Sequence, residues 1–586
     1  MDRLDLTIAN TRAHLLALMK AEGHWEGQLS SSALSTATAI AALALVDATA
    51  HEPFIRAGVD WLAAHQNKDG GWGDTTTSKS NLSTTLLCWA ALGVAGRGIW
   101  PALRCEAWIT AAVGSLEPNQ IAKAVVARYG KDKTFSVPIL MMATLGGRLG
   151  KTAWHRVLSL PFELAIFPRS WFGAIGLPVV SYALPALIAI GHARFYHAPP
   201  SRWSPLYWLR RLAWKRVRPM LKDLQPSTGG YLEATPLTSF VTMALAGAGE
   251  KAHPCVPLAV EFLRRLMRAD GSWPIDTNLA TWGTTLSIKV LGDDLSPEHK
   301  NKLKTWLLGQ QYQAVHPFTN AAPGGWAWTD LPGGVPDADD TAGALIALWH
   351  LCESDAERQA IRSQAQAGVQ WLLNLQNRDG GMPTFCRGWG TLPFDRSSPE
   401  LTAHALWAWH LWREAVPQPA IDRAIRYLRK NQASVAAAWE PLWFGNEHNA
   451  TEANPVYGTA QVVNSLRGAG FGAEKPWIAE AIAALAGEQH ASGGWGGARA
   501  VVPSLEETGV ALKALAQSSS DEPGVQEAIQ RGTAWLVDVT ANGTRFPSAP
   551  IGLYFARLWY HEDLYPVIWT LEALKAVRAR LSRFSK

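Results

Sequence analysis

Three aspartates, Asp337, Asp339 and Asp340, lie within four positions of the stretch GGVPDADDTAGALIALWH, directly before a strongly apolar run. An aspartate at the start of a helix accepts backbone N–H bonds, and this capping role accounts for one or two of them. Carboxyl groups a few ångströms apart cannot all ionise, so one of three keeps its proton near neutral pH. Because the helix N-terminus stabilises the conjugate base, the cluster is typical of a carboxylic acid that protonates a weak base, such as a carbon–carbon double bond.

A metal site is the other use of such a cluster, and the pattern fits it poorly. DADD is not an EF-hand loop, and the DDxxD pattern of magnesium–diphosphate sites is absent, since DDLSPE at 293–298 does not match it. Five cysteines are scattered without CxxC spacing, which favours a reducing compartment and indicates neither a zinc site nor a disulfide framework. We therefore predict that the protein uses no metal and no cofactor.

Composition narrows the class of protein. The 586 residues are 48% apolar and only 18% charged, with a net charge of +5, which is too small to predict a nucleic-acid partner. Tryptophan is unusually abundant, with 29 copies against 16 Phe and 11 Tyr. This excess indicates a need for large aromatic faces, either for packing or for chemistry.

A repeat runs through the chain. AGVDWLAAHQNKDGGWGD (57–74) resembles AGVQWLLNLQNRDGGMPT (367–384), and weaker copies follow at intervals. In the second half, the Gly-rich turns recur every 51 to 57 residues, at Trp273, Trp326, Met382, Trp439, Trp495 and Phe546. Two helices fit between turns, which predicts stacked helical hairpins, and six such units can close into an α/α barrel. We expect Trp72, Trp439 and Trp495 to pack structurally.

Residues 28–227 keep the helical character but lose the regular period. We predict that they form a second helical domain, inserted into a first domain made of residues 1–27 and 228–586. Strand signals are scarce, so the fold class is all-α.

Two segments could touch a membrane. Residues 171–191 carry no charge and are long enough to span a bilayer, but Pro178 and Pro185 interrupt them, which favours a buried helical hairpin. In residues 201–221, basic residues alternate with four aromatic ones: Trp203, Tyr207, Trp208 and Trp214. This pattern suits a bilayer interface, and the alternative is an ordinary exposed basic helix.

Several segments resemble the squalene–hopene cyclase family. PDADDTA is similar to the DxDD acid motif of class II terpene cyclases, and QNKDGGWG and QHASGGWGG are similar to the family's QW repeats. SSPELTAHALWAW resembles the helix that carries a histidine beside the acid. The resemblance covers nearly the whole chain and implies two α/α barrels that enclose a large apolar cavity.

The resemblance also implies roles for residues. Asp339 would donate the proton, Asp337 and Asp340 would orient it and tune its acidity, and His404 would be its hydrogen-bonding partner. Trp328 lies where the family has a cation-stabilising aromatic residue. Weaker candidates for the same role are Trp282, Trp443, Phe546, Tyr554 and Tyr560. Aromatic faces stabilise a carbocation without trapping it, whereas a carboxylate or an amine would trap it.

The segment TFCRGWGTLPFDRSS, with Cys386 and Trp389, is expected at the cavity entrance. The resulting hypothesis is a terpene cyclase, an intramolecular isomerase that converts a linear polyprene such as squalene into a polycyclic triterpene through carbocations. A shorter or modified prenyl chain (sesqui-, di- or meroterpenoid) is the second hypothesis. Two others, from different classes, are a prenyltransferase β-like helical barrel and a non-catalytic scaffold. The family resemblance implies a peripheral, monotopic protein on the cytoplasmic face of the cell membrane, and it leaves open a homodimer.

Overall fold

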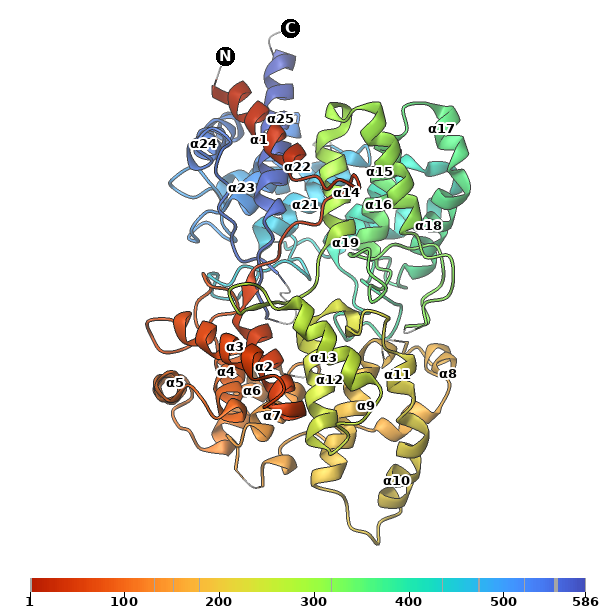
Figure 1. Ribbon diagram of the computed structural model, residues 1–586. Helices are drawn as coiled ribbons and strands as arrows, with labels where there is room; N and C mark the ends of the chain where they lie inside the picture. Colours follow the sequence, from red (N-terminus) through yellow and green to blue (C-terminus); the bar gives the residue numbers. More distant parts are fainter. Residues whose placement is uncertain are drawn as a thin grey trace.

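The computed structural model describes residues 3–584, except for 131, 151, 179, 318, 435, 473–474, 521 and 553–556. The described chain is mostly helical and its helices form two groups, one above the other in Figure 1, which confirms the predicted all-α class. The short strands β1 (Ser31–Ser32) and β2 (Trp273–Pro274) pair antiparallel, with Ser31 opposite Pro274. Both chain ends belong to the upper group.

The lower group contains the first of two helix rings. Within it, α2 packs on α4, α4 on α7, α7 on α9, α9 on α12, and α12 returns to α2. The helices of this group are α2 (Ala33–Asp47), α3 (Glu52–Ala64), α4 (Leu82–Ala95), α5 (Ile99–Val113), α6 (Pro118–Tyr129), α7 (Ser136–Leu145), α8 (Arg169–Ala174), α9 (Val180–His197), α10 (Pro205–Val217), α11 (Met220–Asp223), α12 (Thr235–Gly247) and α13 (Cys255–Leu266), with the 3-10 turns η1 (Ala153–His155), η2 (Phe162–Ile166) and η3 (Tyr231–Glu233).

The upper group contains the second ring, in which α14, α16, α19, α21, α23 and α25 each pack on the next and α25 returns to α14. This arrangement is the α/α barrel that the six-unit repeat predicts. The helices of this group are α1 (Arg3–Ala17), α14 (Ala280–Leu291), α15 (Pro297–Gly309), α16 (Ala338–Leu351), α17 (Asp355–Ala360), α18 (Arg362–Leu375), α19 (Pro399–Leu411), α20 (Gln418–Lys430), α21 (Pro455–Gly468), α22 (Pro476–Gly487), α23 (Leu505–Gln517), α24 (Pro523–Val539) and α25 (Leu564–Phe584), with the 3-10 turns η4 (Gly292–Asp294) and η5 (Arg413–Ala415).

Ring helices and outer helices differ in sequence as their places require. In the ring helix α2, every residue from 33 to 43 is buried, and the sequence ALSTATAIAAL is apolar or small on all sides. The outer helix α20 buries only one stripe, Ala420, Ile421, Ala424, Tyr427 and Leu428, and is charged elsewhere. The stripe follows the helical period and faces the ring.

The repeated turns are held by their tryptophans. Each of these indoles is fully buried and donates its N–H to a leucine carbonyl near the end of the preceding helix, at 2.6 to 2.9 Å. The backbone N–H of each one donates to a threonine hydroxyl on a ring helix. The residues concerned are Trp25, Trp72, Trp273, Trp326, Trp439 and Trp495. The structural role predicted for Trp72, Trp439 and Trp495 is confirmed.

The predicted domain boundary at residue 227 stays a prediction. The packing of the helices changes from one group to the other at a later position in the chain. Helix α12 closes the first ring against α2 and α9, and α13 packs on α12. Residues 235–266 therefore lie with the lower group, although the prediction assigned residues 228–586 to the other domain. The turn at Trp273 keeps the repeat spacing, so the sequence period does not mark this change of ring.

The uncharged segment 171–191 forms the end of α8 and most of α9. Helix α9 packs in the lower ring, as a buried helix should. Among the helices that the structure describes, none combines the length and the apolar character needed to cross a bilayer.

Candidate active site

The aspartate cluster is built on one of the repeated turns. The backbone N–H of Asp337 donates to the carbonyl of Trp326 at 3.0 Å, which fixes the start of α16. Asp337 has extended backbone angles and caps the helix, since its Oδ1 accepts the N–H of Asp340 at 2.9 Å. Capping therefore uses Asp337, and it leaves the carboxyl of Asp339 free for another partner.

That partner is His404. The Nδ1 atom of His404, on α19, lies 2.6 Å from Oδ1 of Asp339, a short bond of the charge-assisted kind. The Trp282 ring stands edge-on to the imidazole, with 6.3 Å between centroids. Adjacent ring helices α16 and α19 thus bring together two residues that lie 65 positions apart. The pairing has the geometry expected of an acid and its hydrogen-bonding partner.

The two flanking aspartates are buried, whereas Asp339 keeps about a quarter of its side chain exposed, toward a cavity. Burial raises the pKa of Asp337 and Asp340, and the charge of Asp339 adds to the shift at each. The raised pKa values of these two flanking carboxyls agree in direction with what the sequence predicts for crowded carboxyls.

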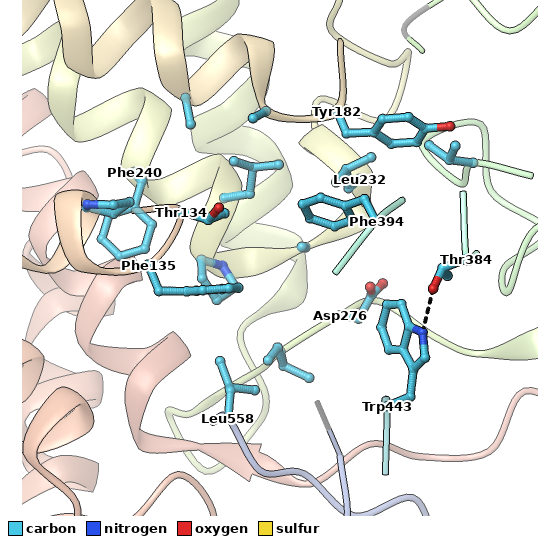
Figure 2. Close-up of a pocket in the computed structure, with 18 of the residues that line it drawn as sticks. Thr134, Phe135, Tyr182, Leu232, Phe240, Asp276, Thr384, Phe394, Trp443 and Leu558 are labelled. Carbon is cyan, nitrogen blue, oxygen red and sulfur yellow. Dashed lines mark hydrogen bonds between the residues drawn. The ribbon is translucent and has the colours of Figure 1, made fainter. Parts of the chain in front are cut away.

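The cavity beside the cluster has a volume of about 500 Å³ and lies between the two groups of helices. Figure 2 shows part of its wall, where Phe135, Phe240 and Phe394 come from the lower group or from loops, and Trp443 from a loop of the upper group. Most of the lining is aliphatic or aromatic. This matches the large apolar cavity that the sequence predicts, in the size range of a small-molecule site.

Four of the six predicted aromatic residues line this cavity: Trp282, Trp328, Trp443 and Tyr560. The indole N–H of Trp443 donates to the hydroxyl of Thr384 at 2.8 Å (Figure 2), so its ring is fixed by a neighbour. Tyr554 lies outside the described residues. These placements agree with a cation-stabilising wall.

Phe546 is expected at the cavity wall, and the structure places its ring elsewhere. The residue does not belong to the cavity lining; it stacks on His14 of α1, with 5.0 Å between centroids. After α24 the chain turns at Gly543, which lies against the carbonyl of Thr7, so the following residues run along α1. The turn position that the repeat predicts is real, but it faces the outside of the ring.

The predicted entrance residues lie near the cavity without lining it. Cys386 is buried, while its neighbour Phe385 is part of the wall. Trp389 is 64% exposed and its indole N–H donates to the carbonyl of Ile175 at 3.2 Å. Their role at an entrance stays a prediction.

The basic and aromatic segment forms α10, at the lower edge of the molecule in Figure 1. Trp203 is almost fully exposed, Trp208 is exposed, and Tyr207 is half-buried. Trp214 does not fit the expected membrane contact, because its ring stacks on His192 at 3.5 Å and its N–H donates to Glu250. The side of α10 that bears Trp214 packs on the fold.

Sequence reasoning missed several cavity residues. Asp276 is one, a carboxyl that lines the cavity and accepts the N–H of Thr277 at 2.7 Å. Burial, and then the charge of Glu233, raises the pKa of Asp276 well above its usual value. Its place three residues after the turn residue Trp273 is the signal that could have pointed to it. Tyr182 and Phe394 also line the wall and stack together, and no motif marks them.

Metal binding is the alternative use of the same aspartate cluster. Within the part of the chain that the structure describes, no group of three or more His, Cys, Asp or Glu side chains is arranged as a metal site. The donor set around Asp339 is instead a carboxyl paired with one imidazole, next to aromatic rings. Such a set suits proton transfer to a substrate in the cavity.

Two linked α/α barrels, with a proton-holding aspartate cluster at an apolar cavity, are the features of a class II terpene cyclase. Family comparisons agree. The squalene–hopene cyclase N-terminal domain matches residues 8–188, and the C-terminal domain of the same family matches residues 279–502. The chain belongs to the squalene–hopene cyclase family.

Individual relatives are distant. The squalene–hopene cyclase of Alicyclobacillus acidocaldarius is 25% identical over 79% of this chain and 78% of its own. Enfumafungin synthase of Hormonema carpetanum is 24% identical over 82% of this chain, which spans only 41% of that protein. The solved structure of ent-copalyl diphosphate synthase from Streptomyces platensis is similar to this chain, with a TM-score of 0.55 and 18% sequence identity. The match covers 97% of this chain and 99% of the chain of that structure. None of these matches supports a prenyltransferase β-like barrel or a non-catalytic scaffold.

Proposed function

We propose that Asp339 starts the cyclisation of a linear polyprene by protonating its terminal double bond. The main support for this proposal is the 2.6 Å contact between Oδ1 of Asp339 and Nδ1 of His404, at the wall of an apolar cavity lined with aromatic side chains. The proton of the Asp339 carboxyl passes to the less substituted carbon of the double bond, and a tertiary carbocation forms at the other carbon. The next double bond attacks this cation and closes a ring, and the sequence repeats until a proton is lost or water adds.

The protein's part is to make the acid strong and to keep the cation alive. When Asp339 ionises, the N–H of His404 Nδ1 and the N-terminus of α16 stabilise the carboxylate. Trp282 and Trp328 lie at this end of the cavity, where each aromatic face stabilises a desolvated cation by about 2 kcal/mol. Burial raises the pKa of both flanking aspartates, which favours their uncharged form, and an uncharged carboxyl traps a cation less readily than a carboxylate does.

The test compares the wild type with Asp339→Asn in detergent, with squalene and C15 and C20 prenyl substrates offered separately. In D₂O, the wild-type product should carry one deuterium from the initiating acid, and the variant should form no product. A matched control is Asp355→Asn, whose fully exposed carboxylate begins α17. Turnover by Asp339→Asn equal to that of the control would refute the assignment.

Two substrate candidates follow from this chemistry. The family resemblance favours squalene and a polycyclic triterpene product. The shorter or modified prenyl chain is favoured by the basic residues Lys133 and Arg557 in the cavity lining. The product pattern from the same incubations distinguishes them.

We also propose that the protein rests on a membrane surface, on the cytoplasmic face of the cell membrane. Apolar residues are exposed along one side, on α10 and around α8, including Trp171, Ile175, Trp203, Trp208 and Leu212. The exposed basic residues Arg211, Lys215 and Arg216 on α10 add attraction to anionic lipid.

Sedimentation with anionic vesicles tests the membrane proposal. Trp203→Ser with Leu212→Ser should weaken binding, whereas Trp100→Ser should not, although Trp100 is 78% exposed on α5, at the other side of Figure 1. Equal binding by all three proteins would contradict the proposed surface. A homodimer stays a prediction.

A further inference from the structure

The cavity has two chemically different ends. Its acid end contains Asp337, Asp339 and Asp340, and Thr384 belongs to this end because its carbonyl accepts the N–H of Ala338 at 2.8 Å. Trp443, bonded to Thr384, therefore also marks the acid end. In Figure 2, Trp443 and Thr384 lie on one side of the cavity, whereas Thr134 and Phe135 lie on the other.

Basic residues of the lining are connected to the opposite end: Lys133 precedes Thr134 there, and Arg557 is linked through Glu452 to Arg128 of α6. Lys133, next to Thr134, and Arg557 line the cavity, and they are the basic side chains among its described lining residues. Lys133 is exposed, and its Nζ donates to the backbone carbonyl of Gly130 at 2.9 Å. Among the described carboxylates, none lies within ion-pair distance of Lys133. It is therefore available to an anion at the rim.

Arg557 belongs to a small network that keeps a net positive charge. Its guanidinium and that of Arg128 share one carboxylate, Glu452, at 3.0 and 3.2 Å. The nearby Asp132 turns its carboxylate back to the N–H of Thr134 at 2.8 Å. Arg128, Arg557 and Lys133 carry three positive charges against the two negative charges of Glu452 and Asp132, so one positive charge remains among these five side chains.

Positive charges at the cavity wall are at odds with a hydrocarbon substrate. A carbocation that moves along the chain approaches the rim as rings close, and the positive side chains there oppose its approach, with a strength that solvent at the exposed rim reduces. An anionic group on the substrate would neutralise the rim and would itself be held by the lysine and the arginine. A hydrocarbon such as squalene has no such group.

We infer that the substrate is a prenyl chain with an anionic head group, held at the rim by Lys133 and Arg557 while its terminal double bond reaches Asp339. The inference rests on the proposed function, since it assigns the acid end to the double bond. It specifies the class of substrate: a prenyl phosphate or diphosphate, or a prenyl carboxylate, with the same anionic chemistry. The Thr134 hydroxyl lies beside Lys133 and adds a neutral donor to the same end.

Binding is measured in the Asp339→Asn protein, so that no probe is consumed. Calorimetry compares geranylgeranyl diphosphate, geranylgeranoic acid and geranylgeraniol, which share one chain and differ in the head. At least one anionic probe should bind about tenfold or more tightly than the alcohol. The ratio between the two anions tells phosphate from carboxylate.

The rim residues are then varied in the same background. Lys133→Gln should lower the affinity for the anionic probe about tenfold and leave that for the alcohol unchanged, and Lys133→Arg should restore it. Lys123→Gln, an exposed lysine on α6, is the matched control. Arg557→Gln should have the same effect as Lys133→Gln. If loss of the ion pair with Glu452 unfolds the Arg557→Gln protein, the Lys133 variants alone provide the test.

Equal affinity for anion and alcohol, or an equal loss of both in Lys133→Gln, would overturn the inference. Because these readouts need no turnover, they are independent of the initiating acid. A protein that binds the anion as expected but still cyclises after Asp339→Asn would keep the head-group site and lose the proposed function.

Discussion

Removal of the His404 side chain's hydrogen bond is the sharpest test of the acid. His404→Leu keeps the volume of the side chain on α19 but loses the 2.6 Å bond to Asp339. A hydrogen bond to a charged group contributes about 1.5–3 kcal/mol, and this one is strongest when Asp339 has given up its proton. The barrier to protonation should rise by that amount, which slows cyclisation about 10- to 100-fold.

The assay is the initial rate of cyclised product at saturating substrate, with circular dichroism as a check of folding. His410→Leu is the matched control, since His410 lies on the same helix and is exposed. A rate for His404→Leu within about twofold of the control would refute the reasoning, since it leaves no room for a bond of that strength.

Three further outcomes are expected. Asp337→Ser should change the free energy of unfolding by only a few tenths of a kcal/mol, because serine also caps helices. The same variant should slow cyclisation about tenfold. Unchanged turnover would show that Asp337 only caps the helix. Trp328→Ala should alter the product profile by gas chromatography while Phe546→Ala leaves it unchanged, and the reverse pattern would contradict the cavity assignment. Burial, and then the charge of Asp74, raises the pKa of Glu447 to about 8 from 4.5, so the folded state holds the extra proton between these values and the free energy of unfolding falls as pH rises. The melting temperature of Glu447→Gln, relative to that of the wild type, should therefore rise between about pH 5 and pH 8. A difference in melting temperature that does not change with pH would refute this linkage.

Local features of the site could be predicted from the sequence because they depend on short spacings. Asp337 can be predicted to cap α16 because it lies three residues before Asp340, whose backbone N–H it accepts. The buried turn tryptophans can be predicted because they belong to a repeat that recurs along the chain. The partner His404 came from resemblance, since nothing in a single helix links it to Asp339. Only the packing of α16 on α19 brings the two together.

The direction in which an aromatic side chain faces could not be predicted in the same way. Phe546 and Trp439 both occupy turn positions, and neither lines the cavity, whereas Trp443, four residues after a turn, does. The difference arises from how loops cross the space between the rings. The rim residues Lys133 and Arg557 are likewise more than 400 positions apart, so their proximity at one cavity is a property of the closed fold.

The acid motif is a modified version of the turn that builds the whole fold. At the equivalent bridge of a later repeat, Trp495 pairs with Ser504, and Ser504 caps its helix by accepting the N–H of Glu507. In the acid repeat, Trp326 pairs with Asp337, which accepts the N–H of Asp340 in the same way. The capping positions thus carry carboxyls here as part of ordinary helix architecture. Asp339, the residue between them, lies at the position of Glu506 in the later repeat and faces the cavity instead. The proposed proton donor is thus the side chain of the acid repeat that the cap does not use.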